Sequence, residues 1–437
     1  MSARQRVRLR SCILLGFACL LSIFMLCSGF DGPHNLKPDL YSAGSADSSQ
    51  GPSNHDNLLL TEAQCREAFP GFDGEIVEAK ALGPFDLPFK EHGVVLQAKI
   101  ENDELYIISA PGKGDLSATM LHRQSATIHQ LYRAIKTSPE PLPNTSFAFG
   151  TQDRPVDASL SFARPIISPS RKRIFPMPHF SFWSWPLPFI NSLPAAARAI
   201  AALEDTLPFA AKDPRAVWRG TTWFNNGAGS HPRLRQDLVA TAAGSLWADV
   251  QALRWETNSR EARNALPIQD FCRYRYIIHT EGIGYSGRLQ FHQLCESVVL
   301  SPPLEWMQHT THLIRPAFSS TLLGRADTSR YPSAYERKGW PREYPVEDAN
   351  MVFVASDWSD LGETVRWLED HQDVAAGIAR RQRETYHGGG YLSPAAEVCY
   401  WRALLRGWNQ VARPVGEKWH QPGVPFEEYV SGREDGR

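Results

Sequence analysis

An uninterrupted apolar segment near the N-terminus constrains this chain more than any other feature. Ser11–Phe30 contains no charged residue over 20 positions and directly follows a tail with an arginine at every second position from Arg4 to Arg10. As a helix that rises 1.5 Å per residue, it would be about 30 Å long, which is the thickness of the hydrocarbon core of a bilayer. The arginines predict a cytoplasmic tail of residues 1–10, so that everything after Phe30 enters the lumen or leaves the cell.

A cleaved signal peptide is the alternative interpretation of this segment. The apolar stretch of a signal peptide is usually shorter, about 7–15 residues, and small residues precede its cleavage site. Cys27-Ser28-Gly29 offers such small residues, whereas the length of Ser11–Phe30 favours an uncleaved signal anchor. Both interpretations send the rest of the chain into the secretory pathway.

The composition argues against nucleic acid as a partner and limits the ways in which the cysteines can form disulfides. With a formal net charge of -1, the chain has no basic field to hold a nucleic acid. Four cysteines follow the apolar segment: Cys65, Cys272, Cys295 and Cys399. In an oxidising compartment they allow three disulfide pairings, which the sequence does not resolve, and Cys295 also fits a small buried side chain without a partner.

Strands and helices are expected to alternate along most of the chain. Residues 31–60 are rich in Gly, Pro, Ser, Asn and Asp, which predicts a disordered stem. Val94–Ile108 predicts two short strands around a polar Asn102-Asp103 turn, and Tyr274–His279 predicts a further strand. Segments such as Ala395–Val411 have the periodicity of amphipathic helices. This alternation predicts the α/β class with parallel sheets.

The segment Tyr274–Leu300 predicts an anion-binding turn. An expected strand, the glycine-rich turn Gly282–Gly287 and an expected helix from Arg288 to about Glu296 follow one another. Free backbone N–H groups and the positive end of a helix bind phosphate, and an arginine adds a bidentate contact. We therefore expect a nucleotide diphosphate at the carboxyl end of the strand. The turn also satisfies G-x-G-x-x-G, so a dinucleotide site and a purely structural turn are alternatives.

Two further segments place polar residues where strands are expected to end. Val217–Trp223 reaches Arg219-Gly220 and then two hydroxyls, which suits the close approach of an anionic ligand. Phe149–Pro155 holds Asp153 in a loop with glycine and proline, where an α/β enzyme would place a general base. A salt-bridged arginine and a turn aspartate are the structural alternatives.

In this order the segments resemble glycosyltransferase family 90, which includes fungal capsule-associated xylosyltransferases and animal protein O-glucosyltransferases. The resemblance covers roughly Leu82–Arg406, and its most specific parts are Trp218-Arg219-Gly220 and Ser286-Gly287-Arg288. It implies an α/β fold of the GT-B type, in which two Rossmann-like domains face a cleft. Residues 61–205 would form the acceptor domain and residues 206–437 the donor domain, preceded by a single transmembrane helix.

The resemblance also implies an activity, an inverting transfer of xylose or glucose from a UDP-sugar to a hydroxyl of a glycan or glycoprotein. Asp153 matches the proposed catalytic base, which takes the proton of the acceptor hydroxyl. The arginines would stabilise the charge that grows on the leaving diphosphate. The implied donor-binding residues are Arg219, Gly220, Thr221, Gly282, Gly284, Tyr285, Ser286 and Arg288.

Two departures from the family pattern keep a second function open. Many members have Asp where this chain has Glu281, and Asn where it has Ile283. They favour, as the alternative, a catalytically inactive, membrane-tethered carbohydrate-binding protein. The location expected in either case is the Golgi or ER membrane, as a single-pass type II protein with a lumenal body.

We expect neither a metal nor a cofactor beyond the donor. No D-x-D pair suggests itself as a metal site, which agrees with arginines holding the diphosphate. His309 and His312 have the spacing of half a helical metal site, without an evident third ligand. His387–Gly390 resembles an esterase oxyanion loop, but it follows the serine of the glycine-rich turn instead of preceding it, which disfavours a serine hydrolase.

Overall fold

The computed structural model describes residues 54–91, 93–167, 173–256, 261–325 and 331–434. The predicted cytoplasmic tail, the predicted transmembrane helix and residues 31–53 of the predicted stem lie outside these ranges. Within them, no helix combines the length and the apolar character needed to cross a bilayer. The predicted stem extends too far at its C-terminal end, because Leu60 is buried in the core.

A mixed six-stranded sheet is formed mainly by the N-terminal half of the described chain. Its strand order is β16-β3-β2-β4-β5-β7. The central strands β2, β3 and β4 pair antiparallel, whereas β4, β5 and β7 run parallel. The hairpin between β2 and β3 turns at Asn102-Asp103, where both residues have a positive φ, as a type I′ turn requires. Strand β4 (Thr145–Gly150) leads directly into the loop that carries Asp153.

A second six-stranded sheet is parallel throughout, with the order β13-β14-β11-β10-β8-β9. Strand β9 pairs with one edge of β8 (Asp213–Gly220), and β10 (Tyr274–Ile278) pairs with the other. The order of the strands therefore reverses at β8. In parallel α/β sheets, ligands bind beyond the carboxyl ends of the strands at such a switch point. Arg219-Gly220 ends β8, and the glycine-rich turn follows β10.

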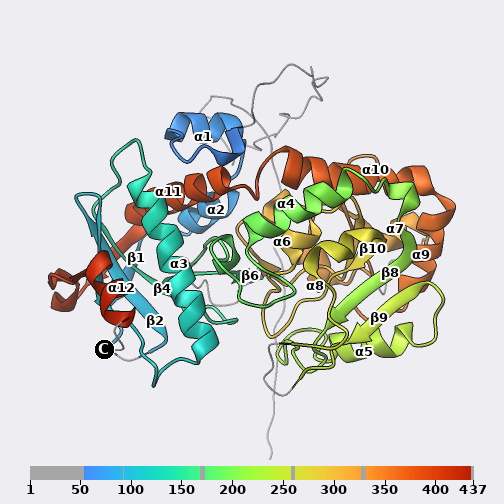
Figure 1. The fold of residues 1–437 in the computed structure, drawn as a ribbon, viewed down its shortest axis with the longest axis horizontal. Helices are drawn as coiled ribbons and strands as arrows, with labels where there is room; N and C mark the ends of the chain where they lie inside the picture. The colour runs from blue at the N-terminus through green and yellow to red at the C-terminus, as the bar shows by residue number, and fades with distance from the viewer. Residues whose placement is uncertain (1–53, 92, 168–172, 257–260, 326–330, 435–437) are drawn as a thin grey trace, which may run out of the picture. The chain divides into compact units, whose positions relative to one another are not determined.

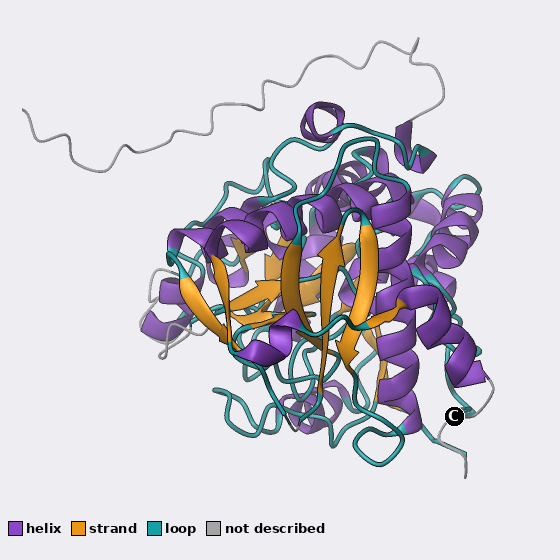
Figure 2. Cartoon of the chain, turned by 90° about the vertical axis from the view of Figure 1, so that its left-hand side faces the viewer, coloured by secondary structure: helices purple, strands orange, loops and turns teal. Residues whose placement is uncertain are grey.

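Figure 1 shows the helices that accompany the strands, and Figure 2 shows the strands lying between helices. Helix α11 packs against α3 and α2, and α10 packs against β11. The α-helices of the described chain are α1 (Glu62–Ala68), α2 (Gly74–Ala81), α3 (Ala118–Lys136), α4 (Leu193–Glu204), α5 (Leu234–Ala242), α6 (Leu289–His292), α7 (Ser319–Leu322), α8 (Ala334–Gly339), α9 (Leu361–Asp370), α10 (Gln372–Arg383), α11 (Pro394–Val411) and α12 (Phe426–Glu434).

The remaining strands are short. Strand β1 pairs with β15 in parallel, and β6 pairs with β12 antiparallel, each as a two-stranded sheet. The strands not bounded above are β1 (Phe85–Pro88), β2 (Val95–Glu101), β3 (Glu104–Ser109), β5 (Ser159–Ser161), β6 (Arg164–Pro165), β7 (Ile174–Pro176), β9 (Ala248–Ala252), β11 (Val298–Ser301), β12 (Trp306–Met307), β13 (Pro316–Phe318), β14 (Met351–Phe353), β15 (Ala412–Val415) and β16 (Val424–Pro425).

Two disulfides resolve the pairing that the sequence left open. Cys65 in α1 is bonded to Cys399 in α11, and Cys272 is bonded to Cys295. Cys295 is therefore a disulfide partner, and the interpretation of it as an unpaired small side chain is wrong. Paired cysteines are typical of proteins that fold in an oxidising compartment.

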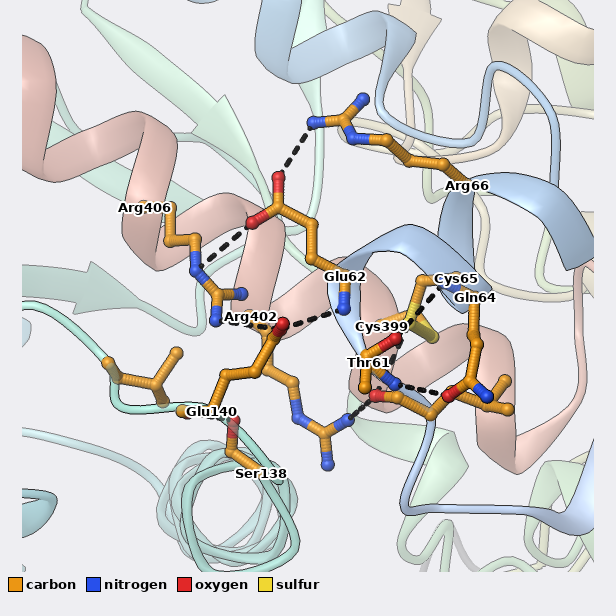
Figure 3. Close-up of polar contacts among 12 residues, drawn as sticks. Thr61, Glu62, Gln64, Cys65, Arg66, Ser138, Glu140, Cys399, Arg402 and Arg406 are labelled. Atoms are coloured by element: carbon orange, nitrogen blue, oxygen red, sulfur yellow. Dashed lines mark hydrogen bonds and ion pairs between the residues drawn. A yellow bond between two sulfur atoms is a disulfide. The ribbon is translucent and has the colours of Figure 1, made fainter.

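Polar contacts reinforce the link between α1 and α11, as Figure 3 shows. The Glu62 carboxylate lies 3.0 Å from an Arg66 nitrogen and 3.4 Å from Arg406 Nε, and the Glu62 backbone N–H donates to Glu140 at 2.8 Å. The buried Arg402 side chain of α11 donates to the backbone carbonyls of residues 58 and 60. The N-terminal end of the described chain is thus fixed to α11 by a covalent bond and by buried hydrogen bonds.

Candidate active site

Asp153 lies in the loop after β4, where an arginine of α3 holds it. The Arg123 Nη1 donates to Asp153 Oδ1 at 2.8 Å, and its guanidinium carbon lies 5.0 Å from the centre of the Phe180 ring. The Asp153 side chain is 34% exposed. The carboxylate is therefore oriented by a cation on one side and still accessible to a ligand.

The glycine-rich turn packs directly against the Asp153 loop. A Cβ atom built on Gly284 would lie 2.0 Å from the main-chain carbonyl oxygen of Asp153, and one built on Gly287 would lie 2.4 Å from His179 Nε2. Real side chains do not tolerate such distances, so both positions require glycine. Tyr285 is buried between them, near the rings of Phe162 and His179. The structure thus brings the predicted base and the predicted donor turn together.

The helix expected from Arg288 to about Glu296 is wrong in length. Helix α6 spans only Leu289–His292. Beyond it the chain continues in tighter turns, with Leu294 N–H donating to the carbonyl of Phe291 and Cys295 N–H to that of His292, both at 3.2 Å. Gln382 Nε2 donates to the backbone carbonyls of residues 292, 295 and 297 at 3.2, 3.2 and 3.0 Å. Because α6 is a single turn, its helix end would add little to the binding of an anion.

Arg288 extends from the turn to the end of β8, where it donates a hydrogen bond to the main-chain carbonyl of Arg219. Burial lowers the pKa of Arg288 to about 10. Among the described residues, no carboxylate forms an ion pair with its guanidinium, and a buried cation of this kind favours an anionic ligand. Ser286, two residues before Arg288, is also buried.

The side chain of Arg219 already has acceptors within the protein. Its Nε donates to the carbonyl of Asn264 at 3.2 Å, its Nη1 to the carbonyls of Trp218 and Asp249, and its Nη2 lies 2.8 Å from the Asp249 carboxylate. Burial raises the pKa of Asp249, but the hydrogen bonds from Arg219 and Tyr274 outweigh it and the net pKa is about 2. It is the main chain of Arg219, and not its guanidinium, that contacts Arg288.

The two residues after Arg219 have packing roles that the sequence did not reveal. A Cβ on Gly220 would lie 2.4 Å from the ring of Trp218, so the bulky indole requires glycine there. The Thr221 hydroxyl accepts a hydrogen bond from Trp255 Nε1 at 2.9 Å, and Thr221 is buried. Both residues shape the backbone at the carboxyl end of β8.

Arg235, in the first turn of α5, is a site residue that sequence reasoning missed. Its guanidinium donates to the backbone carbonyls of Glu281, Thr221 and Thr280 at 2.9, 3.0 and 3.4 Å. Burial and the like charge of Arg288 lower the pKa of Arg235 to about 9, although Asp153 and Glu281 act in the opposite direction. An arginine in the first turn of a helix opposes the helix dipole, and that was the available signal.

Glu281, one of the two departures from the family pattern, has a structural role. Its carboxylate oxygens accept the backbone N–H groups of Glu305 at 2.9 Å and Trp306 at 3.0 Å. Burial raises the pKa of Glu281 well above its usual range. The glutamate therefore ties the start of the glycine-rich turn to the chain that enters β12.

His309 and His312 do not share a helix, because His309 precedes the short 3₁₀ helix Thr311–Leu313 that contains His312. His309 packs against the rings of Tyr400 and Phe182, and His312 Nε2 lies 2.9 Å from the carbonyl oxygen of Gly71. Burial lowers the pKa of His309 to about 3 and that of His312 to about 4. Elsewhere in the described chain, Glu204 lies close to Cys272 and Cys295, but those sulfurs form a disulfide. Metal independence stays a prediction.

Comparison with known proteins identifies the segment that holds this site. Residues 116–319 match the model of glycosyl transferase family 90. This match covers just under half of the chain, and the matched residues are called the family 90 segment below. The family 90 segment includes Asp153, Arg219, Arg235 and Arg288, as well as the whole glycine-rich turn.

Curated relatives of the chain carry the names of O-glucosyltransferases. An O-glucosyltransferase rumi homolog of Anopheles gambiae is 26% identical over 215 residues, which cover 48% of this chain and 44% of that protein. One of Aedes aegypti is 27% identical over 159 residues, covering 35% and 32%. Protein O-glucosyltransferase 1 of Mus musculus is 23% identical over 245 residues, covering 53% of each. The chain thus spans about a third to a half of the length of these relatives.

Proposed function

We propose that this chain is an inverting glycosyltransferase that transfers xylose or glucose from a UDP-sugar to a hydroxyl of a glycan or glycoprotein. The match to family 90 and the names of the relatives support the class of reaction. The observation that carries the proposal is the main-chain contact of Asp153 with Gly284. It supports the proposal because the expected base then lies next to the turn that bears Ser286 and Arg288.

In this mechanism the Asp153 carboxylate removes the proton of the acceptor hydroxyl. The acceptor oxygen forms a bond to the anomeric carbon while the bond from that carbon to the diphosphate oxygen breaks, so the configuration inverts and UDP leaves. Arg123 keeps the carboxylate oriented by its hydrogen bond. Positioned bases of this kind contribute about 10²- to 10⁴-fold to a reaction rate.

Two buried arginines are assigned to the diphosphate of the donor. The like charge of Arg288 contributes to the lowered pKa of Arg235, and an anionic ligand would relieve this repulsion. Arg219, which the resemblance assigns to the same role, acts here through its main-chain carbonyl, which positions Arg288. The remaining expected donor residues shape the cradle: Gly220, Thr221, Gly282, Gly284, Tyr285 and Ser286.

We also propose the GT-B arrangement, with residues 61–205 and 206–437 as the two Rossmann-like domains. The two six-stranded sheets support this division, and the packing of α11 against α3 agrees with a C-terminal helix that returns to the first domain. For residues 1–53 we propose the tail, anchor and stem of a single-pass type II protein of the Golgi or ER. The two disulfides support a lumenal body.

The test is turnover by the full chain with UDP-xylose and UDP-glucose against a panel of glycan and glycoprotein acceptors. Release of UDP that depends on the acceptor, and that Asp153→Asn abolishes, is the expected result. Tight UDP binding without turnover of any donor would contradict the proposal that the chain is an enzyme. It would favour the catalytically inactive carbohydrate-binding protein, which the departures at Glu281 and Ile283 suggested.

A further inference from the structure

One short motif of the sequence lies outside the proposed active site and suits a covalent modification. Asn144-Thr145-Ser146 is the one place in the 437 residues where an asparagine is followed, two positions later, by serine or threonine. Because the residue between them is not proline, these residues form an acceptor motif for N-glycosylation. A glycan is bulky and hydrophilic, so the folded chain must keep the asparagine on its surface.

Asn144 lies on the surface, in the loop that joins α3 to β4. The asparagine is exposed, whereas Thr145 at the start of β4 is buried and Ser146 is half-buried. Pro141 and Pro143 precede it, and both disfavour a continuation of the helix. The motif therefore begins in an irregular surface segment, where a glycan meets no packed neighbour.

The hairpin turn between β2 and β3 determines which way the Asn144 amide faces. The Asn102 N–H donates to Asn144 Oδ1 at 2.9 Å, and the Leu142 N–H donates to Asp103 Oδ1 at 2.9 Å. Because an N–H must face an acceptor, the first bond assigns the amide oxygen to the side of the turn. The Nδ2 atom then faces away from the Asn102 N–H. A glycan is attached through Nδ2 and leaves the amide oxygen intact, so the modified residue keeps its bond to the turn.

The modification would lie at the opposite end of β4 from the proposed base. Asn144 directly precedes this strand, and Asp153 lies in the loop that follows it. A strand rises about 3.3 Å per residue, so the six residues of β4 set its two ends roughly 20 Å apart. A glycan on Asn144 would thus leave the proposed active site accessible.

The two disulfides support the compartment that this modification needs. N-glycans are attached in the lumen of the secretory pathway, which is also an oxidising compartment. Asn144 lies within the sequence separation of 334 residues that the bond between Cys65 and Cys399 closes. The segment that carries the motif therefore belongs to the body that we place in the lumen.

We propose that Asn144 is an N-glycosylation site of this chain. The inference rests on the lumenal location proposed above and not on the proposed reaction. In the modification, Asn144 Nδ2 forms a bond to the anomeric carbon of an oligosaccharide that is carried on a lipid diphosphate. The bond from that carbon to the diphosphate oxygen breaks, the lipid diphosphate leaves, and the transferring enzyme takes one proton from the amide. The Ser146 hydroxyl completes the motif.

The test is the electrophoretic mobility of the full chain, produced in a eukaryotic host, before and after treatment with an N-glycosidase. The wild type should lose the mass of one glycan. Asn144→Asp should show no change, since a carboxylate lacks the amide nitrogen but still accepts from the Asn102 N–H. Ser146→Ala should behave in the same way, and it keeps the main-chain carbonyl to which Trp408 Nε1 donates at 2.9 Å. This second variant decides the matter if Asn144→Asp does not fold.

Two matched control variants should keep the shift in mobility. Ser146→Thr preserves the motif. Asn102→Asp changes the exposed asparagine that contacts Asn144 and lies outside any such motif. Release of the glycan in water labelled with heavy oxygen converts the glycosylated asparagine to labelled aspartate. Mass spectrometry of the peptides should therefore find the label at position 144.

The outcomes separate this inference from the proposed function. A wild-type chain without a shift, but with both disulfides formed, would overturn the glycosylation site and leave the lumenal body standing. If the cysteines of the body also carry free thiols, both are overturned. A shift that persists in Asn144→Asp would place the glycan at another residue and overturn the inference as well. UDP release by Asn144→Asp should equal that of the wild type, and a glycosylated chain that releases no UDP would refute the enzyme but not this site.

Discussion

Gly284 and Asp153 meet through their main chains, at a distance that leaves no room for a side chain on the glycine. Strand β4 delivers Asp153 and strand β10 delivers the turn that holds Gly284, so the contact joins two different sheets. The position of the proposed base relative to the proposed donor turn therefore depends on the absence of a side chain at Gly284. That dependence makes Gly284 the most direct place to test the arrangement.

Gly284→Ala should reduce transfer by about 100-fold or more, because the turn or Asp153 must move by an ångström or more and such misplacement is costly in catalysis. We expect a simultaneous loss of about 1–3 kcal/mol in the free energy of unfolding from overpacking. Gly227→Ala is the control, since a Cβ there meets no atom within 4 Å. Full activity of Gly284→Ala would refute the close contact.

Asp153→Asn should lower the rate of sugar transfer by about 10²- to 10⁴-fold, because an amide cannot take the proton of the acceptor. UDP affinity should stay within about twofold of the wild-type value, since the carboxylate contacts Arg123 and not the expected phosphates. UDP release and calorimetry on the same preparation measure the two quantities. Loss of UDP binding would contradict the assignment of a base.

Arg288→Ala and Arg235→Ala should each weaken UDP binding by about 2–4 kcal/mol, as expected for a buried charged contact. Arg219→Ala should act mainly on stability, by about 3–5 kcal/mol, because the carboxylate of Asp249 would lose its buried partner. Calorimetry and urea denaturation separate the two effects. Arg263→Ala, which removes an exposed pair with Glu256, is the control. Similar effects of all three buried arginines on both quantities would overturn this division.

The buried carboxyl group of Glu397 should make the free energy of unfolding depend on pH. Its side chain is fully buried beside Arg133, and burial raises its pKa to about 7 in spite of that cation. A pKa raised by folding means that the folded state favours the protonated form. The stability due to Glu397 is therefore complete below about pH 4.5 and is lost as the pH rises through 7.

Glu397→Gln should remove this part of the pH dependence. Between pH 5 and 8, the free energy of unfolding of the wild type should fall by up to about 3 kcal/mol relative to that of the variant. Urea denaturation at three pH values measures the difference. Glu75 has a pKa raised to about 7 for the same reason and is retained in both proteins, so it cancels. Parallel pH profiles would rule out the shift at Glu397.

The disulfide between Cys65 and Cys399 closes a sequence separation of 334 residues. Replacing both cysteines by alanine should lower the free energy of unfolding by about 2–5 kcal/mol, because the unfolded chain gains freedom. Limited proteolysis should then cut first near α1, where the covalent link to α11 is gone. An unchanged midpoint in urea together with an unchanged cleavage pattern would contradict this role.

Local patterns in the sequence predicted most of the secondary structure. The alternation over Val94–Ile108 and its Asn-Asp centre correspond to a β-hairpin with a type I′ turn. The periodicity over Ala395–Val411 corresponds to α11, which begins one residue earlier. The prediction failed in α6, where the apolar pattern continues but a distant glutamine binds the carbonyls that a longer helix would use.

The order of residues was enough to indicate the α/β class, the family 90 resemblance, the glycine-rich turn and an aspartate at a strand end. Each of these features depends on residues that are neighbours in the sequence. Folding decided which residues meet. In the folded chain, Cys295 forms a disulfide with Cys272 and the guanidinium of Arg219 forms an ion pair with Asp249. Arg235 lies close enough to Arg288 for the charge of Arg288 to lower its pKa. Such choices depend on contacts between residues far apart in the chain, whose distances and burial no local pattern encodes.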